Sequence, residues 1–431
     1  MTALRLNLIR GADVAKSDPN PKEVIVIGAG IVGVSCALQL AERDFAVTLV
    51  DRNQPCQETS FGNAGVISPW SCVPQSTPGI WRKIPRWMLD PEGPVFVRPR
   101  YMARFLPWAW RFLTAGKPHR VDRHGDAMLA LSRDAPASYR ALLKGTNAVN
   151  LVRDSLYIFV YNKEEQADLN MLAWRMRMSR GVPVSRIGRR ELSRLEPDLS
   201  DEYEAAIVIQ EQGRALDPAG IGEALAGKAQ RRGISFRQAR VNTIQQCDQG
   251  WAVVTGDGEI TARQVVLAAG VWSAGLLKPF GISLPLEAER GYHLVVRNPG
   301  VSIHNSIMDT ERMCVASQMD KGIRVAGTAE FAGIDAMPDY RRAQVFASSL
   351  KSLFPSVRLD EQEPWMGRRP SFPDSLPCIG PVPGLPGLYA AFGHSHYGLS
   401  QAPKTGQIIA DCLSGQTPDT DLTPYRMDRF R

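Results

Sequence analysis

The chain has 431 residues, a formal net charge of +7, and Gly, Pro and charged contents ordinary for a globular protein. At about 150 residues per domain this length predicts two or three domains. The mild positive charge gives no reason to expect a nucleic-acid partner. The seven cysteines include no CxxC pair, which argues against a disulfide scaffold or a structural zinc site and is typical of a reducing compartment.

No segment indicates export or a membrane span. Residues 1–22 lack the apolar core of a signal peptide, so we predict that they form a disordered tail. No stretch reaches the roughly 18 consecutive apolar residues that a spanning helix needs. We therefore expect a cytoplasmic protein, and peripheral contact with the inner face of the cytoplasmic membrane stays open. Nothing in the sequence sets an oligomeric state.

The strongest motif lies near the start of the chain. Residues 24–27 are a β-branched run typical of a buried strand, followed by GAGIVG (28–33), a stretch with helical spacing, and a second apolar run that ends in Asp51. This order predicts a dinucleotide-binding βαβ unit. Gly28 allows the tight turn, Gly30 lets the backbone approach a pyrophosphate, and Gly33 lets the helix lie close to the sheet. Asp51 is placed to accept hydrogen bonds from an adenosine ribose.

This motif by itself does not decide whether the bound dinucleotide is NAD or FAD. The segment ETSFGNAGVIS (58–68) is rich in small residues, so its backbone is able to approach a ligand, although a mobile surface loop fits equally. The sequence 256–258 reads as a hairpin turn, and no second dinucleotide motif is present. With FAD in the single site, electrons enter from an organic substrate and leave to oxygen, a quinone or a carrier protein.

Several motifs along the chain carry a resemblance to a known family. They are VIVIGAGIVGVSCALQLAERDFAVTLVDR (24–52), ETSFGNAGVISP (58–69), VVLAAGVWS (265–273), ERGYHL (289–294), GIRVAGTAEF (322–331), GRRPSFPDSLPCIG (367–380) and GLYAAFGHSHYGLSQAPKTGQIIADCLSG (387–415). In these the chain resembles the D-amino-acid oxidase-like FAD oxidoreductases, within them the bacterial D-amino-acid dehydrogenase branch.

The resemblance implies an α/β fold with a Rossmann-type FAD-binding domain and a second, α+β substrate domain. The FAD-binding domain is expected from residues 23–80, 205–283 and 362–431. The substrate domain, built on a mostly antiparallel sheet, is expected from 81–204 and 284–361. The substrate then lies at the domain interface, a usual place for small-molecule sites.

The glycine motif and the resemblance together predict noncovalent FAD binding. In the family, the turn that starts at Gly393 faces the pyrimidine end of the flavin, at a helix N-terminus, and Val241 holds the adenine side. A relative's attachment cysteine has no counterpart in GRRPSFPD, and Cys378 is expected to be packing. The predicted cofactor-binding residues are Gly28, Ala29, Gly30, Ile31, Val32, Gly33, Asp51, Arg52, Ser60, Asn63, Ala64, Gly65, Val66, Ile67, Val241, Ala269, Gly270, Trp272, Arg369, Gly393, His394, Gly398 and Leu399.

Arg369 is the leading substrate-binding candidate. It matches the arginine of the family's G-x-R-P motif, and its planar guanidinium suits a carboxylate. Arg290, Tyr292, His394 and His396 are further candidates, against the alternatives of a solvated arginine and a packing tyrosine. A metal at His394 and His396 is not predicted because no third ligand is evident. By resemblance the amine binds neutral and the α-hydrogen leaves as hydride, so no general base is named.

Residues 70–110 contain five of the nine tryptophans, interleaved with arginines. This mixture suits a membrane surface or a partner. The alternative, which we favour, is a set of amphipathic helical pieces packed on the FAD domain and separated by prolines at 85, 91, 94, 99 and 107.

The function expected from the resemblance is oxidative deamination of a small D-amino acid, with electrons passing to a quinone or another acceptor. A glycine, sarcosine or cyclic imino-acid enzyme (for D-proline or hydroxy-D-proline) is the near alternative. The sequence His394-Ser395-His396 departs from the GHGTLGW-like form of D-alanine enzymes and keeps that alternative open. A non-catalytic nucleotide-binding Rossmann protein and an NAD-dependent dehydrogenase are the more distant alternatives.

Overall fold

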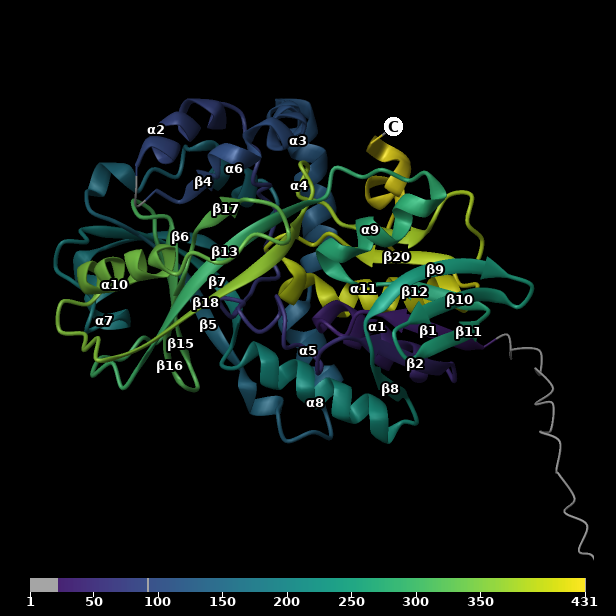
Figure 1. The fold of residues 1–431 in the computed structure, drawn as a ribbon. Coiled ribbons are helices and arrows are strands. Elements are labelled where there is room, and N and C mark those ends of the chain that lie inside the picture. The colour runs from purple at the N-terminus through teal and green to yellow at the C-terminus, as the bar shows by residue number, and fades with distance from the viewer. Residues whose placement is uncertain (1–21, 91–92, 431) are drawn as a thin grey trace, which may run out of the picture.

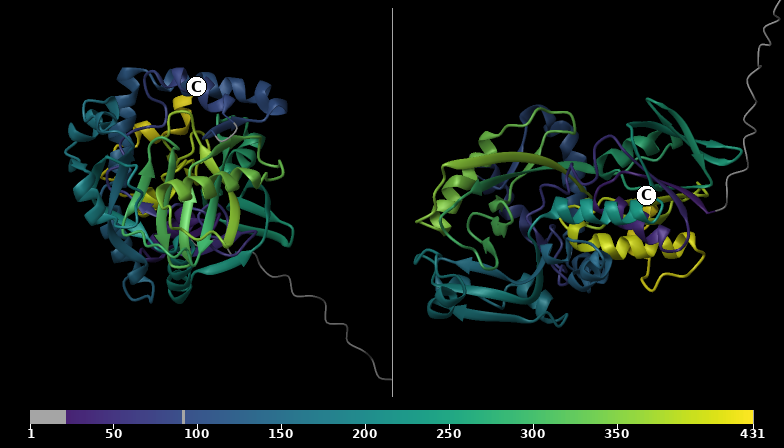
Figure 2. Two further views of the ribbon diagram at one scale, coloured as in Figure 1. Left: turned by 90° about the vertical axis from the view of Figure 1, so that its left-hand side faces the viewer. Right: turned by 90° about the horizontal axis from the view of Figure 1, so that it is seen from below.

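The computed structural model describes residues 22–90 and 93–430. The predicted disordered tail therefore lies, apart from Lys22, outside the described residues. Two large sheets organise the chain (Figure 1). The view from below in Figure 2 separates the larger sheet, at the left, from the smaller sheet and its helices, at the right.

The smaller sheet carries the dinucleotide motif. Its strands run in the order β19-β20-β12-β1-β2-β8, and all neighbours are parallel except β19 and β20. The strands span Cys378–Pro381, Leu388–Phe392, Gln264–Leu267, Glu23–Ile27, Ala46–Asp51 and Ser235–Gln238, in that order. The predicted strand at 24–27 and the apolar run that ends in Asp51 are confirmed as β1 and β2. Their carboxyl ends lie at the same end of the sheet as those of β12 and β20, because these strands are parallel.

Both faces of this sheet are covered, as the continuous apolar runs of its strands require. Val24 and Val26 pack against one face, which α1 (Ile31–Ala41), α11 (Gly398–Leu413), α8 (Pro218–Arg231), α5 (Ala135–Leu143) and α4 (Pro118–Ser132) cover. Ile25 and Ile27 point the other way, because strand side chains alternate. There they meet the three-stranded sheet of β9 (Val241–Cys247), β10 (Gly250–Thr255) and β11 (Gly258–Ala262).

The larger sheet has eleven strands and is mostly antiparallel, as expected; only β5–β14 and β4–β17 are parallel pairs. Its order is β3 (Val66–Ile67), β7 (Ala205–Ala215), β5 (Val152–Tyr161), β14 (Ser306–Asp309), β15 (Cys314–Met319), β16 (Gly322–Ala326), β13 (Glu287–Arg297), β17 (Ala329–Phe331) and β4 (Val95–Val97), with β18 (Glu361–Ser371) on β13 and β6 (Val184–Gly188) on β7. Helices α6 (Leu172–Met178), α7 (Arg189–Leu195) and α10 (Arg341–Leu353) lie beside it.

Some elements differ from their expected bounds or partners. Strands β7 and β18 lie in the larger sheet, although the resemblance implied that 205–283 and 362–431 belong to the FAD-binding domain. Strand β8 ends at Gln238, and β9, which belongs to the three-stranded sheet, begins at Val241. Helix α11 begins at Gly398 and includes Pro403, and α3 (Met102–Ala115) includes Pro107. Proline has no backbone N–H, so each of these helices lacks one backbone hydrogen bond. The packing of the neighbouring helical turns outweighs that loss.

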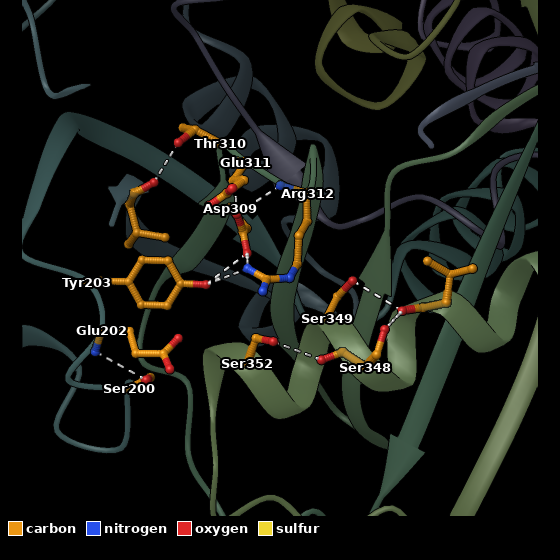
Figure 3. A network of polar contacts seen from close by, with 12 residues as sticks. Ser200, Glu202, Tyr203, Asp309, Thr310, Glu311, Arg312, Ser348, Ser349 and Ser352 are labelled. Carbon is orange, nitrogen blue, oxygen red and sulfur yellow. Dashed lines mark hydrogen bonds and ion pairs between the residues drawn. The ribbon is translucent and has the colours of Figure 1, made fainter. Parts of the chain in front are cut away.

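A buried polar network stabilises the larger sheet on the side of α10 (Figure 3). Tyr203 donates a 2.8 Å hydrogen bond to Asp309 Oδ2, and Arg312 Nη1 lies 3.1 Å from the same oxygen. The backbone N–H groups of Glu311 and Arg312 donate to the other carboxylate oxygen. All the lone pairs of a fully buried carboxylate are thereby used, which fixes the turn between β14 and β15.

Candidate active site

A cavity of about 1060 Å³ lies where the two sheets meet. The residues that follow β1, β2, β12 and β20 line one side of it, and β13 and β18 line the other. The carboxyl ends of parallel strands are the usual ligand site of such sheets. Nineteen of the predicted cofactor residues belong to the lining, as do the three predicted substrate residues outside ERGYHL, Arg369, His394 and His396.

The predicted cofactor residues that line the cavity are Gly28, Gly30, Ile31, Val32, Asp51, Arg52, Ser60, Asn63, Ala64, Val66, Val241, Ala269, Gly270, Trp272, Arg369, Gly393, His394, Gly398 and Leu399. Ala29, Gly33, Gly65 and Ile67 are not in the lining. They lie next to lining residues and support the turns that carry them.

The glycine turn has the geometry that its sequence predicts. Gly28 has φ +104°, and a Cβ there would lie 2.5 Å from the carbonyl oxygen of Ala268. A Cβ on Gly33 would lie 1.8 Å from the carbonyl oxygen of Gly28, so only glycine lets α1 pack this closely. A Cβ on Gly30 would meet only Ser60 Oγ, at 3.4 Å. The backbone at Gly30 is therefore open to the cavity, as a bound pyrophosphate requires.

Asp51 closes the βαβ unit. Its Oδ2 accepts a 2.7 Å hydrogen bond from the N–H of Ala29, and its Oδ1 accepts one of 2.9 Å from the N–H of Asn53. Burial raises the pKa of Asp51, although these two bonds oppose the shift. The carboxylate is held rigidly at the cavity wall, and its contact with a ribose stays a prediction.

The neighbouring residues complete one end of the cavity. The guanidinium of Arg52 lies over the ring of Trp272, 4.0 Å from its centroid, and pairs with Glu58 at 2.5 Å. Ser60 Oγ accepts a 3.0 Å hydrogen bond from the N–H of Ile31, at the start of α1. The segment 58–68 is thus fixed against the glycine turn and is no surface loop. Val241 lines this same end.

Arg369 lies at the other, polar end of the cavity. Its Nη1 donates to Glu289 Oε1 at 3.0 Å and to the carbonyl of Thr328 at 2.8 Å. Its Nε and Nη2 make no hydrogen bond with any residue that the structure describes. A Cβ on Gly291 would lie 2.1 Å from the guanidinium carbon of Arg369, so glycine at this place in ERGYHL makes room for the arginine.

Arg290 and Tyr292 lie on the opposite face of β13 and do not line the cavity, which corrects their selection as substrate residues. Arg290 is fully buried, with Nε 3.3 Å from Glu330. Tyr292 donates a 2.7 Å hydrogen bond to Glu330. The reason is the two-residue period of a strand. Glu289, Gly291 and His293 face the segment 58–75, so Arg290 and Tyr292 face the core beneath α10.

The residue that the sequence reasoning missed is Glu289. It is 3% exposed and accepts hydrogen bonds from Arg369, from Ser371 at 2.8 Å, and from His396. Burial alone would raise the pKa of Glu289, but His396, Arg369 and Ser371 outweigh it and hold that pKa well below its usual range. The alternation of side chains along β13 could have identified Glu289, because it puts Glu289 and Gly291 on the same face of the strand.

Two other polar residues of the lining were also missed. Gln75 lies 2.8 Å from His396 through its side-chain nitrogen. Arg177, on α6, lines the cavity near Tyr157 and Tyr397, and its Nε has no hydrogen-bond partner among the described residues. Neither stands in a motif, so no local pattern marks them.

His394 and His396 point to different partners, although the HxH spacing of an extended segment would put them on one face. Ser395 has φ +48°, in the left-handed region, which turns the chain between them. His394 is buried and lies 2.9 Å from Thr405 Oγ1, and burial lowers its pKa to about 3. His396 faces the cavity and Glu289. Among residues 22–90 and 93–430, no cluster of three or more His, Cys, Asp or Glu residues suits a metal ion.

Cys378 lies outside the cavity lining. It is fully buried and 3.3 Å from Arg429 Nη1. Burial raises its pKa to about 11, which leaves the thiol protonated and inert. This placement agrees with packing as its role.

The tryptophan-rich segment packs with one face and exposes the other. Phe105, Trp108 and Phe112 of α3 line the cavity, and Trp108 donates a 3.2 Å hydrogen bond to the carbonyl of Ser371. Trp110 is 70% exposed and Leu106 58%. Helices α2 (Ile84–Leu89) and α3 lie together at the top of Figure 1. The inner face therefore packs mainly on the larger sheet, through Phe331, and the outer face stays open.

The fold and the cavity define a dinucleotide-dependent oxidoreductase. A glycine turn at a helix N-terminus, a carboxylate fixed at the cavity wall and a cavity lined by both sheets fit a bound FAD. A family model described as FAD-dependent oxidoreductase (DAO) matches residues 23–412.

Relatives agree with that match over the whole chain. A "D-amino-acid oxidase" of Bradyrhizobium diazoefficiens is 37% identical over 96% of this chain and 100% of its own. A "D-amino acid dehydrogenase" of Rhizobium rhizogenes is 31% identical over 95% and 100%. Among solved structures, L-proline dehydrogenase from P. horikoshii has a TM-score of 0.72 at 20% identity, covering 96% and 98% of the two chains. Glycine oxidase from Geobacillus kaustophilus has a TM-score of 0.71 at 22% identity, covering 94% and 98%.

The chain belongs to the DAO family of FAD-dependent oxidoreductases. It is an enzyme and its cofactor is FAD. None of the described helices is long and apolar enough to cross a membrane.

Proposed function

We propose that this enzyme oxidises the α-carbon of a D-amino acid, with FAD held noncovalently in the cavity. The bound flavin supplies the chemistry by accepting the α-hydrogen as hydride at N5. The imino acid then hydrolyses to a 2-oxo acid and ammonia. The names of the two rhizobial relatives support a D-amino acid as the substrate class.

The observation that carries this proposal is the free edge of Arg369. Its Nη1 is anchored by Glu289 and Thr328, which sets the plane of the guanidinium. Its Nε and Nη2 have no hydrogen bond within the described part of the chain, and the side chain lines the cavity. These two donors form the fork that a carboxylate accepts side-on. Arg369 thereby binds and orients the substrate.

The test is the visible spectrum of the purified enzyme without oxygen, before and after adding D-, L- and N-alkyl amino acids. We expect the flavin band to bleach with D-amino acids. Bleaching with only glycine, sarcosine or a cyclic imino acid would move the enzyme to the alternative substrate class. A colourless protein that FAD does not restore would contradict the proposal altogether.

Arg369→Lys tests the carboxylate assignment in the same assay. We expect kcat/KM to fall about 100-fold, because a lysine cannot form the bidentate pair and a desolvated charge pair is worth about 2–5 kcal/mol. Most of the loss is expected in KM. An unchanged KM for the substrate would show that Arg177 or another group binds the carboxylate.

We also propose that the electrons pass to a quinone or another acceptor at a membrane surface. Exposed Trp81, Leu106 and Trp110 stand beside exposed basic residues of α2 and α3. Leu106 also lines the cavity, so an apolar path runs from this surface inward. We expect the FAD-loaded enzyme to bind vesicles rich in phosphatidylglycerol, and Trp110→Ser to weaken binding several-fold at unchanged stability. Faster turnover with oxygen than with a soluble quinone would contradict the proposal that a quinone is the electron acceptor.

A further inference from the structure

Glu289 anchors Arg369 in the function proposed above, but its bond to His396 has no role there. Glu289 is buried between three donors and carries its full negative charge at the polar end of the cavity. Arg369 needs one carboxylate oxygen to anchor its Nη1. The bond from His396 goes to that same oxygen, Oε1, and Ser371 binds the other. The carboxylate is thus shared between the substrate-binding arginine and an imidazole.

The turn that carries His396 is held in an unfavourable backbone conformation. Ser395 has φ +48°, which costs a non-glycine residue on the order of 1–2 kcal/mol. Its N–H donates a 3.0 Å hydrogen bond to the carbonyl of Pro370, and His394 forms a bridge with Ser371. The N–H of Tyr397 closes the turn on His394 at 2.8 Å. The strand that carries Arg369 thereby also positions His396, and strain of this kind gathers at functional sites.

The ring of His396 is oriented by one nitrogen and open at the other. Its Nε2 contacts both Glu289 and, at 2.8 Å, the side-chain nitrogen of Gln75. We assign the proton to Nε2, because the charged carboxylate of Glu289 can only accept a hydrogen bond. Its Nδ1 makes no hydrogen bond with residues 22–90 or 93–430. The side chain is 38% exposed and lines the cavity. A neutral His396 therefore presents an unshared electron pair to whatever occupies the polar end.

Several charged and titratable groups surround this ring. Glu289 of β13 faces it directly, and Arg369 of β18 shares that carboxylate. Tyr397 at the start of α11 has its ring centroid 6.2 Å away, and Arg177 of α6 and Cys72 lie beyond Tyr397. Among residues 22–90 and 93–430, Glu289 is the one carboxylate that contacts the imidazole. A proton gained at Nδ1 would leave an ion pair with a carboxylate that is already in place.

We propose that His396 is a general base, which accepts at Nδ1 one proton from the α-ammonium of the substrate, and that Glu289 is the positioning residue that orients it. The inference rests on the proposed function. The nitrogen–hydrogen bond of the ammonium breaks, its electron pair stays on the substrate nitrogen, and the proton forms the new bond to Nδ1. The amine is then neutral, which the departure of the α-hydrogen as hydride requires. The proton returns to solvent through the exposed ring.

The experiment is anaerobic flavin reduction by a D-amino acid, followed in the holoenzyme from about pH 5.5 to 10. In the wild type we expect the second-order rate to fall on the acid side well below the pKa of the free amine. In His396→Gln this limb disappears. The rate falls at least about 100-fold at neutral pH, the usual contribution of a general base, and rises with pH up to the amine's own pKa.

Glu289→Gln separates positioning from structure. Removing the carboxylate charge disfavours the protonated ring, so we expect the acid limb to move to lower pH by about one unit or more. Glu289→Asp keeps the charge and is the matched control, with the limb close to its wild-type position. If Glu289 only anchors Arg369, Glu289→Gln raises KM and leaves the limb in place, which overturns the assignment. A wild-type pH profile in His396→Gln overturns it as well.

A second measurement does not depend on turnover or on the stability of the variants. Imidazole nitrogen NMR of the wild-type holoenzyme, with the His396 signals identified by their loss in His396→Gln, reports the tautomer. We expect the proton of the neutral ring on Nε2, and a proton on Nδ1 overturns the proposal. Failure of every amine to bleach the flavin would instead overturn the proposed function, so the two failures are distinguishable.

Discussion

Two glycine-edged turns lie on the same side of the cavity, after parallel strands of the smaller sheet, and they are built differently. The turn at 28–33 follows β1 and opens α1, and the turn at 393–398 follows β20 and opens α11. The first is held by its own βαβ unit and the adjoining strand β12, through Ala29–Asp51 and the contact of Gly28 with Ala268. The second is held by residues of the other sheet, through Pro370, Ser371 and Glu289.

This difference separates cofactor binding from substrate chemistry. A pyrophosphate is bound by backbone N–H groups at a helix N-terminus, and such a site needs only local spacing and glycines. The proposed substrate chemistry needs Arg369 of β18, Glu289 of β13 and His396 of the turn before α11 together. We therefore expect substitutions in the first turn to impair FAD binding by steric exclusion. Substitutions in the second turn and its partners are expected to slow substrate oxidation by changing charge and orientation.

The largest effect is expected at the first turn. Gly33→Ala puts a methyl group 1.8 Å from a backbone oxygen, which no rotamer change relieves. We expect a loss of unfolding free energy above about 3 kcal/mol, the upper end for overpacking, and protein that purifies without flavin. The measurements are urea denaturation and the ratio of visible to ultraviolet absorbance.

Gly30→Ala is the control for that prediction. Its Cβ has room, and Gly30 has φ −67°, which alanine adopts freely. We expect stability unchanged within about 0.5 kcal/mol but weaker FAD binding, because the methyl group occupies the backbone approach. If Gly30→Ala and Gly33→Ala lowered the free energy of unfolding equally, the turn would not be a phosphate-binding site.

Two buried histidines, His394 in the second turn and His293 on β13, are expected to lower the free energy of unfolding in mild acid. Burial lowers the pKa of His394 and of His293 to about 3, from 6.5. The unfolded chain binds these protons first, so stability is complete above pH 6.5 and falls as the pH drops toward 3. From pH 7 to 5 each histidine is expected to cost about 2 kcal/mol. Urea denaturation of wild type and His394→Gln checks this, because the variant should show a shallower pH dependence. Parallel pH curves would contradict it.

The smallest effect is expected from Ser395→Gly. Glycine adopts φ +48° without strain, and the change also removes a buried hydroxyl that has no partner among the described residues. The greater entropy of the unfolded chain offsets part of the gain, so we expect the unfolding free energy to rise by less than about 1 kcal/mol. Flavin reduction should slow several-fold, because His396 is less firmly held. A large loss of stability would show that the serine side chain supports the turn.

The sequence predicted the cofactor region well because its signals are local. The apolar run at 24–27, the spacing of Gly28 and Gly33 and the acid at 51 act within thirty residues, so periodicity and steric reasoning reach them. The hairpin at 256–258 is confirmed for the same reason. The prolines at 107 and 403 were less informative, because packing around α3 and α11 decides whether a helix continues through them.

The substrate end could be predicted only in part. Arg369 was identified by its motif, but Arg290 and Tyr292 were chosen by residue type from ERGYHL without the phase of the strand. Glu289 and Gly291 share the cavity face because β13 pairs with β18, from Glu287 opposite Ser371 to Arg297 opposite Glu361. A one-residue change of phase reverses every side chain of a strand, and only the pairing sets that phase.

The sequence by itself determined that the chain has a dinucleotide-binding turn, two kinds of sheet and a family's motifs in order. It did so because backbone conformation and hydrophobic period depend on neighbouring residues. The tertiary structure alone decided which side of β13 faces the cavity, that Arg369 shares Glu289 with His396, and that His394 is buried and neutral. Those properties depend on burial and on charges that lie tens to hundreds of residues apart in the chain, which no local pattern encodes.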